Sequence, residues 1–290
     1  MITISDLYQQ ARKKLMETED PQSAGMIARN LLVQATGKRM EQLLADQQAP
    51  ADASVCAAME ALVSRIAGGE PLAYVLGNWE FYGLPLYVDR NVLIPRDDTC
   101  AVTSLAVKQG LFLGENPRIL DLCTGSGCIG LALASRLPDA RVTLADISKP
   151  ALAVAHKNIV SNKLSSRVSA VQVNALEAPP PFLGKFDMIV SNPPYITGRE
   201  MEELPGSVKD FEPHLALYGG EDGLDFYRAI AQNFRSALKP DGYLCFEFGM
   251  GQGDEVSKIL MKNGYTVLER TKDYNDRERA VIARYTRKED

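Results

Sequence analysis

Apolar residues recur at helical spacing over about the first 70 residues of the chain. One helical face follows the i, i+3, i+4, i+7, i+11 pattern: Ile4, Leu7, Tyr8, Ala11 and Leu15. A capping-box residue, Thr3, marks the start of this helix, and Asp20 before a proline marks the start of a second helix that ends at Gly37. The pattern predicts about four short helices over residues 1–75, a bundle suited to recognising a substrate.

The pattern changes after this bundle. Over residues 76–100, aromatic and β-branched residues alternate around Gly77 and Gly83, which predicts a β-hairpin linker. Over residues 101–290, short apolar runs alternate with helical patterns, as in a doubly wound parallel α/β domain. Five runs are strand candidates: RILDLC, RVTLADI, VSAVQVN, FDMIVSN and GYLCFEFG. Two later runs, GYTVLER and RAVIARY, flank a short polar turn and are expected to pair antiparallel.

Composition narrows the class of protein. The chain is 46% apolar and 24% charged, which is typical of a soluble globular protein. It contains neither a long apolar span nor the pattern of a signal peptide, so we expect a cytoplasmic protein without a membrane partner. Five scattered cysteines and two histidines predict free thiols and no metal site. A net charge of −5 argues against a large surface for binding nucleic acid.

The first predicted strand runs into the segment DLCTGSGCIG, whose Gly125, Gly127 and Gly130 match G-x-G-x-x-G. Nicotinamide dinucleotides and S-adenosylmethionine both bind at loops of this kind. A dinucleotide places a pyrophosphate at the helix N-terminus, whereas S-adenosylmethionine brings an ammonium group that needs an acceptor. Asp121, four residues before Gly125, suits the ammonium and would repel a pyrophosphate.

The next two predicted strands also end in polar residues. Asp146 is placed to bind the ribose hydroxyls of either cofactor; the alternative is a helix cap beside Ser148. Asn174 lies where an adenine would be bound, with an amide that can both accept and donate hydrogen bonds. The alternative for Asn174 is an ordinary turn residue.

The fourth predicted strand is followed by Asn-Pro-Pro-Tyr, residues 192–195. Because open α/β sheets bind ligands beyond the carboxyl ends of their strands, these residues should face the same crevice as the glycine loop. Pro194 holds Pro193 extended, so the Pro193 carbonyl is a fixed acceptor, and the Asn192 side-chain oxygen is a second one. Two such acceptors bind a planar NH₂ group, and Tyr195 offers a flat face beside it. The alternative is a strand terminator with a tyrosine that packs nearby.

This arrangement favours methyl transfer from S-adenosylmethionine to an amide or aryl nitrogen. Such a nitrogen is a poor nucleophile, and hydrogen bonds from both of its protons aim its lone pair and stabilise the developing positive charge. No strong base is needed, because the proton is lost after transfer. A nicotinamide enzyme has no use for the motif.

The chain closely resembles the protein-(glutamine-N5) methyltransferases of the PrmC/HemK type. The resemblance rests on the segments above, on EPHLALYGGEDGLDFYR and on the stretch from GGEPLAYVLG to VLIPR. The resemblance covers nearly the whole chain. It implies a Rossmann-like class I methyltransferase domain, with a seven-stranded, mostly parallel sheet and an antiparallel last strand, after the helical bundle and hairpin. It also implies methylation of the glutamine in the Gly-Gly-Gln loop of class-1 peptide-chain release factors, by a cytoplasmic monomer.

The resemblance assigns roles by position. The residues expected to bind S-adenosylmethionine, and the product S-adenosylhomocysteine, are Asp121, Cys123, Thr124, Gly125, Ser126, Gly127, Asp146, Asn174 and Asn192. Asn192, Pro193 and Tyr195 are the catalytic candidates, and with Pro194 they would bind the substrate glutamine. Three positions depart from the family pattern. Cys123 replaces a glycine, so we expect a negative φ with the thiol pointing away from the ligand; Asn174 replaces an acid; and PRDDTC replaces Pro-Arg-Pro-Glu-Thr-Glu.

Several alternatives remain open. A glutamine methyltransferase of a ribosomal protein has a similar glycine loop. Asn-Pro-Pro-Tyr is shared with DNA adenine-N6 methyltransferases, but residues 1–75 carry seven Lys/Arg against nine Asp/Glu, a net charge of −2 that is unsuited to phosphate contacts. A sensor protein that binds the cofactor without catalysing a reaction would have no use for the Asn-Pro-Pro-Tyr motif. The segment EPHLALYGGEDG is expected to wall the substrate slot; the alternative is a plain polar loop.

Overall fold

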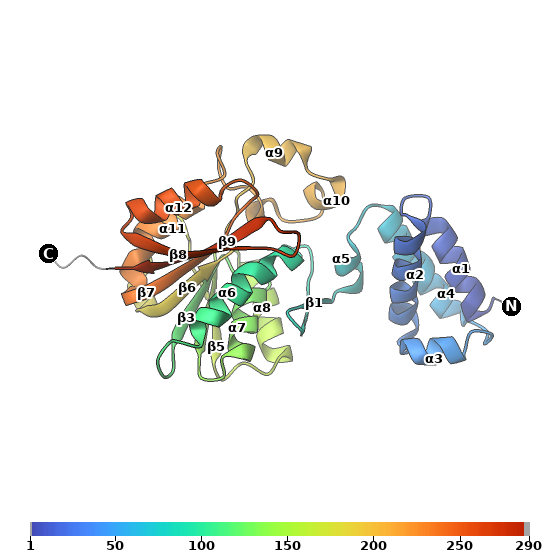
Figure 1. Cartoon of the computed structure of the whole chain (residues 1–290). Helices are drawn as coiled ribbons and strands as arrows, with labels where there is room; N and C mark the ends of the chain where they lie inside the picture. The colour runs from blue at the N-terminus through green and yellow to red at the C-terminus, as the bar shows by residue number, and fades with distance from the viewer. Residues whose placement is uncertain (1, 287–290) are drawn as a thin grey trace. The chain divides into compact units, whose positions relative to one another are not determined.

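The computed structural model describes residues 2–286 and divides them into two units (Figure 1). The first unit comprises residues 2–78 with 205–211, and the second comprises residues 79–204 with 212–286. The predicted hairpin thus belongs to the second unit. Within the described range, no helix is long and apolar enough to cross a membrane.

The first unit is helical, as the apolar stripes predict. Its helices are α1 (Ile4–Leu15), α2 (Pro21–Thr36), α3 (Met40–Ala45), α4 (Ala53–Ala67), α5 (Leu72–Leu76) and α10 (Gly206–Lys209). The capping box at Thr3 is confirmed, and Asp20 accepts hydrogen bonds from two backbone amides at the start of α2. Gly37 ends α2 with a φ of +66°, which a residue without Cβ adopts at no steric cost. Apolar faces of α1, α2 and α4 meet in one core that includes Leu15, Leu31 and Met59.

The second unit begins with the predicted hairpin. Strands β1 (Trp79–Phe81) and β2 (Leu84–Leu86) pair antiparallel. The two residues between them, Tyr82 and Gly83, both have positive φ, as the tight turns that match strand twist require. A 3₁₀ turn, η1 (Asp97–Thr99), then leads directly into helix α6 (Cys100–Gly110).

The predicted sheet is confirmed. Its strands are β3 (Arg118–Leu122), β4 (Arg141–Asp146), β5 (Val168–Gln172), β6 (Phe186–Ser191), β7 (Leu238–Glu247), β8 (Tyr265–Lys272) and β9 (Glu278–Tyr285). They lie in the order β5-β4-β3-β6-β7-β9-β8. Strands β3 to β7 are parallel to one another, whereas β9 runs antiparallel to both β7 and β8. The expected antiparallel pairing of the last two runs is therefore confirmed.

Helices cover both faces of this sheet (Figure 1). Helices α6, α7 (Cys128–Arg136) and α8 (Lys149–Ser161) pack on one face, and α11 (Asp225–Asn233) and α12 (Gly253–Lys262) pack on the other. The remaining elements are α9 (Gly198–Glu203), η2 (Pro181–Leu183), η3 (His214–Ala216) and η4 (Phe234–Ala237). Successive strand residues alternate between the two cores, as Ile119 and Leu120 do, because side chains on a strand point to opposite faces.

The topology creates a crevice at one edge of the sheet. From β3 the chain winds outward to β4 and β5, then returns to place β6 on the other side of β3. The loops that follow β3 and β6 therefore leave the sheet in opposite directions. Open α/β sheets bind ligands in the crevice between such loops. Helix α7 packs closely here, since a Cβ on Gly130 would come within 2.2 Å of Leu144 Cδ2.

Candidate active site

The loop between β3 and α7 is held in left-handed backbone conformations. Cys123, Gly125 and Gly127 have φ values of +61°, +53° and +85°. A Cβ on Gly125 would meet nothing within 4 Å, so this glycine faces open space, whereas one on Gly127 would come within 3.0 Å of Leu144 Cδ1. The two glycines therefore play different roles. Gly125 borders the crevice, and Gly127 permits close packing of α7.

The expectation of a negative φ at Cys123 was wrong, whereas its side chain packs against the core beneath α11 and α12. Its φ is positive, and the residue lies in the wall of the cavity. The physical reason is the turn after β3, in which the next amide, that of Thr124, donates to the carbonyl of Ala145 at the end of β4 (3.1 Å). The backbone keeps the conformation that suits the family's glycine, and the non-glycine residue bears the strain.

A cavity of about 270 Å³ opens at this edge of the sheet. That volume is close to the lower end of the range for small-molecule sites, about 300–1,000 Å³. Of the predicted site residues, those in its wall are Cys123, Thr124, Gly125, Ser126, Asp146, Asn174, Asn192 and Pro194. Four others are not in the wall: Asp121, Gly127, Pro193 and Tyr195. The segment predicted to wall the slot contributes Pro213, Leu215 and Ala216.

Asp146 lies at the end of β4 with both carboxylate oxygens engaged by the backbone. Oδ2 accepts from the Gly125 amide and Oδ1 from the Ser148 amide, each at 2.9 Å. Ser148 itself caps helix α8. Burial raises the pKa of Asp146, and these amides oppose the rise. The carboxylate is thus fixed at the cavity wall with lone pairs left for a diol.

Asp121 is fully buried behind the loop. Its Oδ2 accepts from Thr124 Oγ1 (2.5 Å) and from the Gly130 amide (2.8 Å). Its Oδ1 has no hydrogen-bond partner within the described residues. Burial raises the pKa of Asp121 to about 7. An orphaned, buried acceptor this close to a ligand loop fits a cationic or water-mediated partner that the protein alone does not supply.

Asn174 follows β5 and lies in the cavity wall with its amide already engaged. Oδ1 accepts from the Leu176 amide (3.0 Å), and Nδ2 donates to Glu177 Oε1 (2.8 Å). These local bonds are those of the turn residue considered from the sequence. One oxygen lone pair remains for a ligand.

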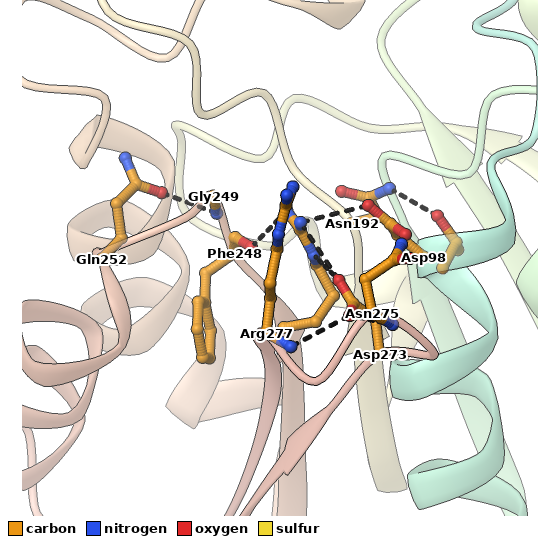
Figure 2. Close-up of polar contacts among 10 residues, drawn as sticks. Asp98, Asn192, Phe248, Gly249, Gln252, Asp273, Asn275 and Arg277 are labelled. Atoms are coloured by element: carbon orange, nitrogen blue, oxygen red, sulfur yellow. Dashed lines mark hydrogen bonds and ion pairs between the residues drawn. The ribbon is translucent and has the colours of Figure 1, made fainter.

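Asn192 follows β6, and its amide nitrogen is directed to Thr99, which also lies in the cavity wall. Nδ2 donates to Thr99 Oγ1 (3.3 Å), while Oδ1 has no donor among residues 2–286. The dashed line from Asn192 in Figure 2 marks this bond, beside the start of α6 where Asp98 lies. The carbonyl of Pro193 likewise accepts no hydrogen bond in the described chain. The two predicted acceptors are therefore both without an internal donor.

Tyr195 lies next to the cavity wall without forming part of it. Its ring packs with the core beneath α11 and α12, close to Gly249, and its carbonyl accepts from Gln252 Nε2 (3.1 Å). Burial raises the pKa of its hydroxyl, which therefore stays protonated near neutral pH. The ring is held rigidly behind the Asn-Pro-Pro segment.

Sequence reasoning missed two groups of residues around the cavity. The segment from Asn91 to Arg96 forms one wall and is tied to the opposite wall by Glu212, which accepts from the Ile94 amide and the Arg96 guanidinium. The second group is Thr99 with Glu247, beneath Asn192. A signal for Glu247 was present, because it is an acid within the otherwise apolar run GYLCFEFG.

Fold and site together define the class. A β5-β4-β3-β6-β7-β9-β8 sheet, a glycine loop after its first strand and an acid after the second are the features of a Rossmann-like class I methyltransferase. A family model for the methyltransferase small domain matches residues 103–206, and one for the PrmC N-terminal domain matches residues 6–77.

Relatives identify the family. The release factor glutamine methyltransferase of Clostridium acetobutylicum is 42% identical over 213 residues, which are 73% of this chain and 74% of the relative. That of Chlorobaculum tepidum is 38% identical over 257 residues, 87% of each chain. The chain belongs to the family of release factor glutamine methyltransferases. A solved methyltransferase from Pyrococcus furiosus shares the fold, with a TM-score of 0.52 at 19% identity over 77% of this chain and 98% of that one.

The left-handed backbone at Cys123 predicts an unusual order of stability among variants. Cys123→Gly should be more stable to unfolding than Cys123→Ala by about 1 kcal/mol, because only glycine adopts positive φ without strain. At Cys128, the first residue of α7, the order should reverse, since alanine is favoured in a helix. Urea unfolding of the four variants tests this, and the same order at both positions would contradict it.

The buried Asp121 predicts a pH dependence of stability. Its folded-state pKa of about 7 lies above that of an unfolded aspartate, about 3.9, so the folded state binds an extra proton between these values. The free energy of unfolding therefore falls as pH rises from about 4 to 7, by up to about 1.4 kcal/mol per pH unit for this group.

Asp121→Asn should reduce that slope by the same amount. Urea unfolding at half-unit steps from pH 5 to 7 measures it, and the exposed Asp139→Asn should leave the slope unchanged. An unaltered slope in Asp121→Asn would show that Asp121 does not titrate there.

Proposed function

We propose that this protein transfers a methyl group from S-adenosylmethionine to the side-chain N5 of the glutamine in the Gly-Gly-Gln motif of class-1 peptide-chain release factors. The observation that carries this proposal is the orientation of Asn192. Its amide nitrogen is bonded to Thr99, and its oxygen and the Pro193 carbonyl have no donor within the described part of the chain. Two fixed acceptors beside a cofactor cavity match the two N–H groups of a primary amide.

The cavity fits S-adenosylmethionine by the chemistry of its walls. Asp146 would hold the ribose hydroxyls, and the open face of Gly125 would let the ligand approach the backbone. Asp121, which is buried behind the loop and not in the wall, would bind the ammonium group through water at Oδ1. Asn174 would border the adenine. When bound, S-adenosylmethionine supplies an electrophilic methyl group and leaves as S-adenosylhomocysteine.

Positioning of the glutamine nitrogen accounts for the chemistry we assign to the protein. Asn192 Oδ1 and the Pro193 carbonyl would accept the two N–H groups and aim the nitrogen lone pair at the methyl carbon. As the N–C bond forms and the C–S bond breaks, positive charge develops on nitrogen, and the two acceptors stabilise it. The nitrogen then loses its proton to solvent. No general base is required, which agrees with the protonated Tyr195 hydroxyl.

The partner is inferred from the family. Relatives named as release factor glutamine methyltransferases support a release factor as the substrate. We assign recognition to the helical first unit, and propose that the protein acts as a cytoplasmic monomer without DNA or membrane partners. Residues 1–75 carry seven Lys/Arg against nine Asp/Glu, which disfavours phosphate contacts.

The decisive experiment locates the transferred methyl group. The protein is incubated with methyl-labelled S-adenosylmethionine and purified class-1 release factor, either wild type or with the Gly-Gly-Gln glutamine replaced, and the label is mapped by mass spectrometry. We expect label on that glutamine and none on the replaced factor. Labelling of ribosomal protein or DNA, in parallel incubations, without labelling of the factor would contradict the proposal.

Asn192→Ala should separate binding from chemistry. The affinity for S-adenosylmethionine should stay within a few-fold, while kcat falls at least about 100-fold, because the developing charge loses an aligned acceptor. Asn174→Ala is the matched control, since it removes a cavity-wall asparagine away from the nitrogen acceptors. It should weaken cofactor binding with little change in kcat. Calorimetric titration and initial rates measure both, and unchanged turnover in Asn192→Ala would remove its proposed role.

A further inference from the structure

Asn192 and Glu247 emerge side by side from neighbouring strands. In the parallel pairing of β6 and β7, Ser191 lies opposite Phe246, so the next residue of each strand is Asn192 and Glu247. Phe246 packs in the core beneath α11 and α12, whereas Cys245 packs beneath α6. By strand alternation Glu247 therefore faces the α6 side, where Thr99 stands at the start of that helix.

Glu247 is a buried acid that the fold does not explain. It is 1% exposed, and its Oε2 has no hydrogen-bond partner in the described part of the chain. The nearby cation, Arg279, is already engaged by ion pairs to Asp98 (3.1 Å) and Asp273 (3.3 Å). Figure 2 shows Asp98, Asp273 and Asn192 close to one another. A buried carboxylate with an open acceptor normally serves a specific neighbour.

The groups around Glu247 identify that neighbour. Burial raises the pKa of Glu247 to about 7, and the groups that oppose the rise are the Thr99 side chain, the Arg279 charge and the Asn192 side chain. The charge of Asp98 raises the pKa of Glu247. Thr99 and Asn192, which bond to each other, are therefore the polar side chains that favour the charged form of Glu247.

The orientation of the Asn192 amide depends on these acceptors. An amide presents donors on one side and an acceptor on the other, and a half-turn exchanges them. With its nitrogen held by Thr99 Oγ1 and near the Glu247 carboxylate, Asn192 presents its oxygen to the cavity. In the reversed orientation its NH₂ group would face the NH₂ group of the substrate, with donors opposed and no acceptor for the reacting nitrogen.

We propose that Thr99 and Glu247 are positioning residues, which hold the Asn192 amide with its nitrogen toward the protein and its oxygen toward the substrate amide. This inference rests on the proposed function, and it adds two residues that act through Asn192: Thr99, in the cavity wall, and the buried Glu247.

Kinetics at pH 8, where the Glu247 carboxylate predominates, test the proposal. Glu247→Gln and Thr99→Val should each lower kcat by 10-fold or more, with KM for the release factor and Kd for S-adenosylmethionine changed by less than 3-fold. Thr99→Ser keeps the hydroxyl and should stay within 3-fold of wild type. Thr103→Val is the matched control, since it removes a buried hydroxyl one turn along α6, bonded to the Thr99 carbonyl, and should leave kcat unchanged.

A double-mutant comparison separates positioning from general damage. In the Asn192→Ala background, Glu247→Gln should cause no further loss of kcat, because the group on which it acts is gone. A double variant that loses the product of the two single effects would overturn the proposal, as would wild-type kcat in Glu247→Gln and Thr99→Val.

A second measurement needs no acceptor substrate, so its failure is distinct from failure of the proposed function. In ¹⁵N-labelled protein, the Asn192 side-chain NH₂ protons should exchange slowly with solvent in wild type and in Thr99→Ser. They should exchange at least 10-fold faster in Thr99→Val and Glu247→Gln. Equal exchange rates in all four proteins would refute the inferred amide orientation, even if the release factor is methylated.

Discussion

The chemistry that we assign to this protein depends on the direction of one side-chain amide. Asn192 is bonded through its nitrogen to Thr99, which leaves its oxygen as an acceptor beside the Pro193 carbonyl. The neighbouring elements hold these two acceptors in place. Strands β6 and β7 bring Asn192 beside Glu247, helix α6 begins with Thr99 on the same side, and the Tyr195 ring is packed behind the loop. A site that stabilises charge by preorganised acceptors needs this rigidity more than it needs a strong base.

Two buried acids, Asp121 and Glu247, lie near the ends of β3 and β7, and each has one oxygen without a partner among residues 2–286. In both, burial raises the pKa to about 7. Burying either carboxyl group costs desolvation free energy, which the two hydrogen bonds to Asp121 offset only in part. Buried acids of raised pKa beside a cavity are candidates for functional residues, which agrees with the roles that we propose for them.

Cys123 shows how a fold can keep a conformation when its usual residue is lost. The family's glycine is replaced, yet the backbone remains left-handed because the Thr124 amide must reach the Ala145 carbonyl across the end of β4. The tertiary structure as a whole holds this backbone conformation against a local strain of about 1–3 kcal/mol. The glycine loop therefore keeps the shape that borders the cavity, and the substitution changes the strain and the side chain but not the path of the chain.

The sequence by itself determined the order and type of the elements, because apolar periodicity and capping residues are local properties. The capping box at Thr3, the helix end at Gly37 and the strand run ending at Asn192 all follow from residues close by in the chain. It also predicted Asp146 and Asn192 at one crevice, since parallel strands end at a common edge. Only the tertiary structure decided which predicted residues reach the cavity, the backbone of Cys123, and the placement of Thr99 and Glu247 beneath Asn192. These depend on contacts between segments about 20 to 150 residues apart, and such contacts leave no periodic signal in the chain.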